Sequence, residues 1–215
     1  MRFIIGRQLI RHGQLFIIGC MSCLSCLVSS CNKEESEPGE WDNWQQRNEA
    51  YFASLQDSLQ QNPQQWRRIK SFTLDPATEG QPTDYVFAKV IAEGTGTESP
   101  AYTDSVRVIY RGRFIPSATY PEGYVFEETV KGTFSPATGS TYLSTVSSNI
   151  VGYATALQHM HRGDHWRVYI PSELAYGDEG NTSVPGHSLL IYDMILVDFS
   201  HAGVPMPAWS SRQRR

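Results

Sequence analysis

Apolar and polar residues alternate in four short segments of the chain, and this pattern predicts β-strands. The segments are 85–91 (YVFAKVI), 105–115 (SVRVIYRGRFI), 165–170 (HWRVYI) and 188–199 (SLLIYDMILVDF). In the third segment Trp166, Val168 and Ile170 fall on one side of the strand, where we expect Trp166 to fill the core. The last segment is the longest and the most apolar, so we expect it at the centre of a sheet. Phe199, near its end, is likewise expected to be a core residue.

Two other segments have helical spacing. Residues 41–62 hold no Pro or Gly and are followed by Pro63. Their apolar positions recur at steps of seven, four and four: Trp44, Tyr51, Leu55 and Leu59. This predicts one amphipathic helix, which ends at the proline. Its apolar stripe either packs on the chain's own domain or pairs with a second copy, so a homodimer through residues 41–61 is one of two alternatives. A second, short helix is predicted by Ile150, Tyr153, Ala154, Leu157 and Met160.

Several antiparallel strands with one helix to bury against them predict an α+β domain. We place this domain at residues 84–200. Residues 63–83 contain Pro76, Gly80 and Pro82 and predict an irregular linker. The tail at 201–215 has no periodic pattern, and we expect it to be disordered.

The first thirty residues have the features of a secretory signal peptide. A basic stretch precedes the apolar run 15–28, which is too short for a comfortable membrane span; its basic residues are Arg2, Arg7 and Arg11. The sequence LVSSC, which ends at Cys31, resembles the lipobox of bacterial lipoproteins, and this implies lipidation of Cys31. The other cysteines (Cys20, Cys23 and Cys26) lie inside the signal, so no disulfide can form within the mature chain.

The residues after Cys31 predict an acidic, solvated tether over 31–40. This run resembles the export signal of surface lipoproteins in Bacteroidetes, so we expect a lipid-anchored protein of the bacterial cell envelope, at the outer membrane. Removing the three arginines of the signal from the 18 basic residues leaves 15 against 22 acidic ones, a net charge of about −7. This acidic balance argues against a nucleic-acid partner. The 40% share of hydrophobic residues is typical of one soluble globular domain.

The sequence lacks the short motifs of many enzyme classes. There is no GxSxG, no HExxH, no phosphate loop and no dinucleotide glycine pattern. His159, His161 and His165 lie close together in the sequence. They fall at a helix end and in an alternating strand, however, and cannot all face one point. We therefore expect three exposed histidines, no metal and no cofactor.

Aromatic and small residues gather instead at five places in the predicted loops and strand ends: Tyr110-Arg-Gly112, Phe126-Glu127, Ile150-Val-Gly152-Tyr153, Ala175-Tyr176-Gly177 and Tyr192. Here the chain resembles the FKBP family of peptidyl-prolyl cis-trans isomerases, over residues 84–200. The most specific part is ELAYGDEG followed by VPGHSLLIYDMILVDF. NIVGYATALQHMHRGDHWRVYIP resembles the helix of the family and the strand that follows it.

The resemblance implies an antiparallel half-barrel sheet wrapped around one short helix, with an apolar pocket for a prolyl ring. The residues that it places around this pocket are Tyr110, Phe126, Ile150, Tyr176 and Tyr192, with Tyr153 as the floor and Glu127 as the acidic residue beside it. The Ile150 N–H and the Tyr176 hydroxyl would hold substrate carbonyls. The family usually has tryptophan in place of Tyr153 and aspartate in place of Glu127. One further pocket aromatic is either Phe134 or Tyr142.

The implied function is isomerisation of proline-containing, unfolded or exported polypeptides. Two alternatives stay open at this point. The pocket could hold peptides without meaningful turnover, as a chaperone module does, or the chain could be a structural lipoprotein of the envelope.

Overall fold

The fold is built on one antiparallel sheet of seven strands, seen in a computed structural model that describes residues 39–135, 137 and 139–209. These residues belong to one compact unit, Pro38–Arg215. The predicted signal peptide, Cys31 and most of the tether lie outside the described residues. Within the described ranges, no helix is both long enough and apolar enough to cross a membrane.

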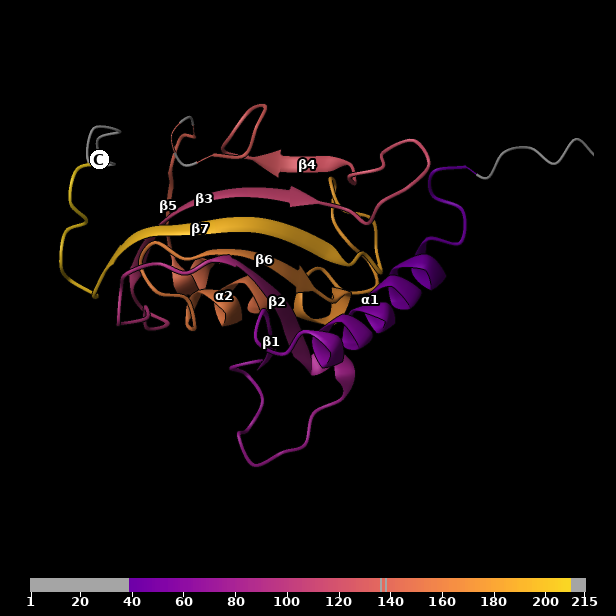
Figure 1. Cartoon of the computed structure of the whole chain (residues 1–215), viewed down its shortest axis with the longest axis horizontal. Coiled ribbons are helices and arrows are strands. Elements are labelled where there is room, and N and C mark those ends of the chain that lie inside the picture. Colours follow the sequence, from indigo (N-terminus) through magenta and orange to yellow (C-terminus); the bar gives the residue numbers. More distant parts are fainter. Residues whose placement is uncertain (1–38, 136, 138, 210–215) are drawn as a thin grey trace, which may run out of the picture. The chain divides into compact units, whose positions relative to one another are not determined.

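The strands lie in the order β1-β2-β6-β7-β3-β4, with β5 also paired to β3 (Figure 1). Their bounds are β1 Trp66–Lys70, β2 Tyr85–Ala92, β3 Ser105–Arg113, β4 Val125–Glu128, β5 Tyr142–Thr145, β6 His165–Ile170 and β7 Leu190–Ser200. Three short 3-10 helices join them: η1 Pro82–Asp84, η2 Val146–Ser148 and η3 Ser172–Leu174. Strand β7 lies between β6 and β3, as expected for the longest and most apolar segment.

One face of the sheet packs against the short helix α2, Val151–Leu157, which contacts β1, β2 and β6. Gly152 allows this close packing, because a Cβ atom at its position would lie 2.3 Å from Cγ2 of Ile170. Val86 and Val168, on the same face, are fully buried. This arrangement confirms the predicted α+β class.

The opposite face of the same strands is covered at one end by helix α1, Trp44–Gln61 (Figure 1). Phe52 stacks on Phe87 of β2, with ring centroids 4.9 Å apart, and Tyr51 lies 6.5 Å from Tyr169 of β6. Phe87 pairs with Tyr169 across the two strands, one position from the residues that face α2. The apolar stripe of α1 therefore packs on the chain's own sheet, the first of the two predicted alternatives.

Two hydrogen bonds tie α1 to the segment that enters β7. The Trp44 indole N–H donates to Oγ of Ser188 over 3.0 Å, and the Leu189 backbone N–H donates to Oδ1 of Asn48 over 2.9 Å. Asn48 is buried and was not part of the predicted stripe. Its amide satisfies a backbone group that would otherwise be buried without an acceptor.

Two predicted boundaries are wrong. The linker at 63–83 is not irregular throughout, because β1 lies inside it and pairs antiparallel with β2. The sheet therefore begins before residue 84. The tail is not loose from residue 201 either: Arg107 donates to the carbonyl of Pro207 over 2.9 Å, and Nδ1 of His201 lies 2.9 Å from Oδ2 of Asp104. The buried Asp104 carboxylate also accepts from the Ala202 N–H over 3.2 Å, so its hydrogen bonds hold the start of the tail.

Candidate functional site

Three tyrosines from three elements meet on the α2 face of the sheet. Tyr110 of β3, Tyr153 of α2 and Tyr192 of β7 contact one another edge to face, with ring centroids 5.1–6.2 Å apart. Tyr153 and Tyr192 are buried, whereas Tyr110 is half-buried. The geometry is the favourable one for aromatic pairs, in which the edge of one ring faces the plane of the next. We call Tyr110, Tyr153, Tyr192 and the next ring, Phe126, the ring cluster.

Phe126 joins the ring cluster from strand β4. Its ring is half-buried and lies edge-on to Tyr192, with centroids 5.8 Å apart. Gly112 of β3 leaves the space for both rings: a Cβ atom there would lie 2.7 Å from Cζ of Phe126 and 2.9 Å from Cε1 of Tyr192. Any side chain at residue 112 would displace one of the two rings.

Among the described residues, Glu127 has the only carboxylate that forms hydrogen bonds with the rings of this cluster. Its Oε1 accepts a short hydrogen bond from the Tyr192 hydroxyl, and its Oε2 lies 3.5 Å from the Tyr110 hydroxyl. Burial, followed by the negative charge of Glu127, raises the pKa of both tyrosines well above the ordinary value. Tyr192, which the resemblance places around the pocket, is buried, and Glu127 is the hydrogen-bond partner of its hydroxyl.

Ile150 and Tyr176 lie at the margin of the cluster. Ile150 is the N-cap of α2: its carbonyl accepts from Ala154 N–H over 3.0 Å, while its own N–H finds no acceptor among the described residues. Burial and then Glu127 raise the pKa of Tyr176, although a hydrogen bond from Asn181 acts in the opposite sense. One free N–H and one hydroxyl therefore lie beside half-buried apolar surface.

Of the two candidates for a further aromatic, Tyr142 lies at the site and Phe134 does not. Tyr142 of β5 is edge-on to Tyr110, with centroids 5.9 Å apart, and is 47% exposed. Phe134 packs on the other face of the sheet, in a small cluster with Ile109 and Ile195. The two core expectations hold, since Trp166 and Phe199 are both buried.

The Tyr153 hydroxyl is a buried polar atom without a hydrogen-bond partner in the described part of the chain. Burial is the largest cause that raises its pKa, and the nearby Tyr110 and Glu127 add to this effect. The floor of the cluster therefore stays uncharged and carries one unsatisfied donor. Such a group costs free energy in the folded state.

The three histidines do not form a metal site. Nδ1 of His159 bonds to the Thr155 carbonyl, and His161 lies 3.6 Å from Asp164. The prediction that all three are exposed is wrong for His161 and for His165, which are both half-buried; His165 lies against the ring of Phe134. Within residues 39–135, 137 and 139–209, no group of three His, Cys, Asp or Glu side chains could hold a metal ion.

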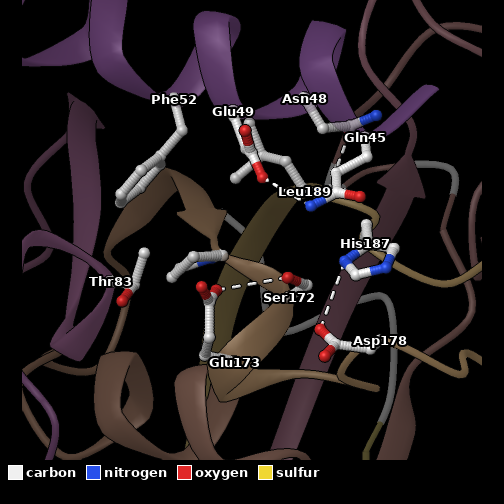
Figure 2. Close-up of a pocket in the computed structure, with 11 residues that line it drawn as sticks. Gln45, Asn48, Glu49, Phe52, Thr83, Ser172, Glu173, Asp178, His187 and Leu189 are labelled. Carbon is white, nitrogen blue, oxygen red and sulfur yellow. Dashed lines mark hydrogen bonds and ion pairs between the residues drawn. The ribbon is translucent and has the colours of Figure 1, made fainter. Parts of the chain in front are cut away.

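A separate small pocket of about 160 Å³ lies between α1 and the segment 171–189 (Figure 2). Polar side chains line much of it, including Gln45, Glu49 and Glu173, and His187 pairs with Asp178 over 3.2 Å. None of the residues that the sequence predicts for the prolyl site lines this pocket. It is therefore distinct from the ring cluster.

Sequence reasoning missed two residues that touch the site. Phe114 stacks on Phe126 with centroids 4.8 Å apart, and the Asn181 side chain lies near enough to the Tyr176 hydroxyl to lower the pKa of that group. Phe114 could have been found, because it follows the Tyr110-Arg-Gly112 motif in an apolar strand end. Asn181 lies in a polar loop with no pattern to mark it.

The arrangement favours binding without covalent chemistry. The site presents apolar rings, a free N–H at Ile150, the Tyr176 hydroxyl and one carboxylate that two hydroxyls already approach. No serine, cysteine or lysine with an adjacent base belongs to the group, so it lacks the pattern of an activated nucleophile. Such a site can remove water from a ligand and hold it in one orientation.

Comparison with known proteins matches residues 96–197 to the family described as FKBP-type peptidyl-prolyl cis-trans isomerase. The "FKBP-type 22 kDa peptidyl-prolyl cis-trans isomerase" of Escherichia coli is 37% identical over 111 residues, 51% of this chain and 48% of that protein. "Outer membrane protein MIP" of Legionella longbeachae is 40% identical over 89 residues, 41% of this chain and 33% of that protein. The chain spans about half the length of the curated relatives it matches first.

The fold has a counterpart among solved structures. A peptidyl-prolyl cis-trans isomerase from Pseudomonas syringae superimposes with a TM-score of 0.52 at 21% identity, over 77% of this chain and 100% of that one. At this identity the likeness concerns the fold alone.

Proposed function

Residues 96–197 form a domain of the FKBP type, and from this premise we propose that the chain is a peptidyl-prolyl cis-trans isomerase acting on unfolded, proline-containing polypeptides. The observation that carries the proposal is the ring cluster itself, in which four aromatic side chains and Glu127 meet on the α2 face of the sheet. The names of the relatives support the same activity.

The reaction requires rotation about the peptide bond before proline, against a barrier of about 18–20 kcal/mol. The planar amide is charge-separated and well solvated, whereas the twisted amide has lost this resonance. Apolar rings that exclude water therefore raise the energy of the planar form relative to the twisted one. Uncatalysed isomerisation takes tens to hundreds of seconds, so turnover in milliseconds requires about five decades, or roughly 7 kcal/mol.

The residues of this chain divide that task. The rings of Phe126 and Tyr192 exclude water from the prolyl ring, and the buried Tyr153 closes the site below it. The N–H of Ile150 and the hydroxyl of Tyr176 hold carbonyls on either side of the proline, while the carbonyl of the peptide bond before proline rotates. Glu127 is held by tyrosine hydroxyls and keeps the rings in place rather than transferring a proton.

We also propose that the chain acts in the bacterial envelope, secreted by the signal at 1–30 and anchored by lipid on Cys31, with residues 31–40 as a tether. The sequence pattern supports this, together with the name of the outer membrane protein from Legionella longbeachae. Radiolabelled fatty acid should be incorporated into the full-length protein expressed in its bacterial host, and Cys31→Ala should abolish the label. Persistent label in that variant would place the lipid elsewhere.

Turnover of a short Xaa-Pro peptide by the purified protein tests the activity. We expect a rate above background, and a lower rate for Tyr176→Phe with an unchanged circular dichroism spectrum. A protein that suppresses aggregation of an unfolded client without any isomerase rate would instead be a peptide-holding module. If deletion of the domain damages the cell envelope but variants of the ring cluster do not, the chain would instead be a structural lipoprotein.

A further inference from the structure

A groove of about 460 Å³ lies directly beside the ring cluster. It is lined by the aromatic residues Trp41, Phe114, Tyr124 and Phe126 and by the loop 181–185. None of these lining side chains carries a charge. Trp41 precedes α1 and lies outside the residues that match the family, so the N-terminal part of this chain supplies one wall.

The groove is continuous with the ring cluster through Phe126. This ring is edge-on to Tyr192 in the cluster and stacks on Phe114 in the groove, with centroids 4.8 Å apart. Phe114 in turn contacts Trp41 edge to face, with centroids 6.0 Å apart. An unbroken series of aromatic contacts therefore runs from the proposed prolyl site to Trp41.

Trp41 is held in place although half of its surface is exposed. It is 49% exposed, and its ring packs against Trp44 at 4.9 Å. The residue before it is fixed twice: Arg47 donates to the Glu40 carbonyl over 2.8 Å, and the Ser117 hydroxyl donates to the Glu40 carboxylate over 2.9 Å. The indole face is thus presented to solvent with little conformational freedom left to lose on binding.

The loop that forms the rest of the groove is also preorganised. Oδ1 of Asn181 accepts from the N–H groups of Ser183 and Val184 over 2.8 and 2.9 Å, and the Asn181 N–H donates to the Val184 carbonyl. The same Asn181 side chain lies near enough to the Tyr176 hydroxyl to lower the pKa of that group. The loop therefore runs from the groove to a residue of the proposed catalytic site.

We propose that this groove binds an aromatic or large apolar side chain of the substrate polypeptide, two or three residues from the proline. The inference rests on the proposed isomerase function, since it takes the ring cluster as the prolyl site. Each aromatic contact in the series spans 6 Å or less. An extended peptide advances about 3.3 Å per residue, so a side chain at that separation reaches Trp41 while the proline stays in the cluster. The groove then gives the enzyme a sequence preference beyond the residue that adjoins the proline.

The test compares peptides that share one Ala-Leu-Pro-Ala core and carry either Trp or Ala two or three residues before or after the proline. The preference is the ratio of kcat/KM for the Trp peptide to that for its Ala counterpart. We expect the wild-type protein to prefer Trp at one of these positions by about tenfold, the effect of roughly one well-packed aromatic contact. Trp41→Ala should bring this ratio close to one, and Trp41→Phe should keep it close to the wild-type value.

Two further variants make the result specific. Thr182→Glu places a charge in the groove and should also reduce the ratio. Tyr102→Ala removes an equally exposed aromatic that packs on Phe72, outside the groove, and should leave the ratio unchanged. A wild-type ratio near one, or a ratio that survives both Trp41→Ala and Thr182→Glu, would overturn the groove proposal.

Fluorescence anisotropy with dye-labelled versions of the same peptides separates this proposal from the proposed function. If no peptide is turned over, the isomerase function fails, and the ratio of dissociation constants for Trp and Ala peptides still decides whether the groove binds the aromatic side chain. If all peptides are turned over with neither a kinetic nor an affinity preference, the isomerase function stands and the groove proposal fails.

Discussion

Near the ring cluster, neighbouring residues of β3 and β7 face opposite sides of the sheet, and their chemistry is opposite. Tyr110 and Arg111 are adjacent in β3, and Tyr192 and Asp193 are adjacent in β7. The tyrosines point to the α2 face and enter the ring cluster, whereas Arg111 and Asp193 are cross-strand neighbours on the other face. Because successive residues of a strand face opposite sides of the sheet, an apolar binding site and a charged network can lie on opposite faces and still be built from residues adjacent in sequence.

The charged side chains around Asp193 and Arg111 are paired with opposite charges. Asp193 is 4% exposed and takes two hydrogen bonds from Arg167, over 2.8 and 3.1 Å, with Arg113 at 3.4 Å. Arg111 binds Glu128 over 2.7 Å. Burial by itself would raise the pKa of Glu128, but hydrogen bonds from Lys131 and Arg111 outweigh it and lower that pKa. These charges are fixed by one another, so this face should govern stability while the ring face governs turnover.

Removing the central carboxylate is expected to have the largest effect. Asp193→Ala leaves two half-buried guanidinium groups without their buried partner and should cost about 3 kcal/mol in the free energy of unfolding, the lower end of the range for breaking a buried ion pair. Urea denaturation measures this loss. Asp178→Ala, which breaks an exposed pair with His187, is the control and should change stability by less than about 1 kcal/mol. Equal losses in the two variants would contradict the separation of the faces.

Two half-buried phenylalanines on opposite faces provide the next comparison. Phe126→Ala opens the ring cluster to water and should lower kcat/KM on a Xaa-Pro peptide about tenfold to a hundredfold, equivalent to about 1.4–2.7 kcal/mol. Phe134→Ala removes the same ring from the other face and should lower stability while leaving turnover per folded molecule intact. A peptide assay with parallel urea denaturation distinguishes them. The comparison breaks down if Phe134→Ala slows turnover as much as Phe126→Ala does.

Removing single hydroxyls from the ring cluster should have smaller effects on the free energy of unfolding, and the two effects should have opposite signs. Tyr153→Phe removes a buried hydroxyl that has no partner and should raise the free energy of unfolding by about 1 kcal/mol. Tyr192→Phe removes a hydroxyl that donates to Glu127 and should lower it. Both variants keep the ring, so thermal or urea denaturation reports the hydroxyl alone. Destabilisation by Tyr153→Phe would mean that this hydroxyl has a partner after all.

The smallest expected effect is a pH dependence from the charged face. Burial lowers the pKa of His165, and the nearby Arg167 adds to this, although Asp193 opposes it. The folded state therefore holds the neutral ring. Its contribution to the free energy of unfolding is present above the pKa of histidine in the unfolded chain, about 6.5, and is lost as the pH falls below that value. Urea midpoints between pH 7.5 and 5.5 should fall less steeply in His165→Gln than in wild type. His159→Gln, an exposed control, should keep the wild-type slope.

The main strands and both helices could be predicted because their periodic patterns are long. β1 was missed because it has only five residues, three of them basic, beside a stretch rich in proline and glycine. β4 and β5 have four residues each, too few for alternation to be read. Their pairing is decided by contact with β3, which a single sequence does not reveal.

The candidate site was predictable to the extent that its residues belong to recognisable motifs. The choice between Phe134 and Tyr142 depended on the path of the chain between β4 and β5, and spacing carries no information on that path. The approach of Asn181 to Tyr176 depends on a tight loop, and the place of Trp41 depends on how the turn before α1 is anchored. Each of these is a tertiary contact between segments far apart in sequence.

The attachment of α1 has a consequence for where the protein can be cut. A fragment that begins at residue 84 would lose both α1 and β1, leave Phe87 and Tyr169 open to water and deprive the Leu189 amide of its acceptor. Such a truncation product should aggregate or be degraded in the cell. We therefore expect the smallest autonomous folding unit to start at or before Trp44, well upstream of the region by which the family is recognised.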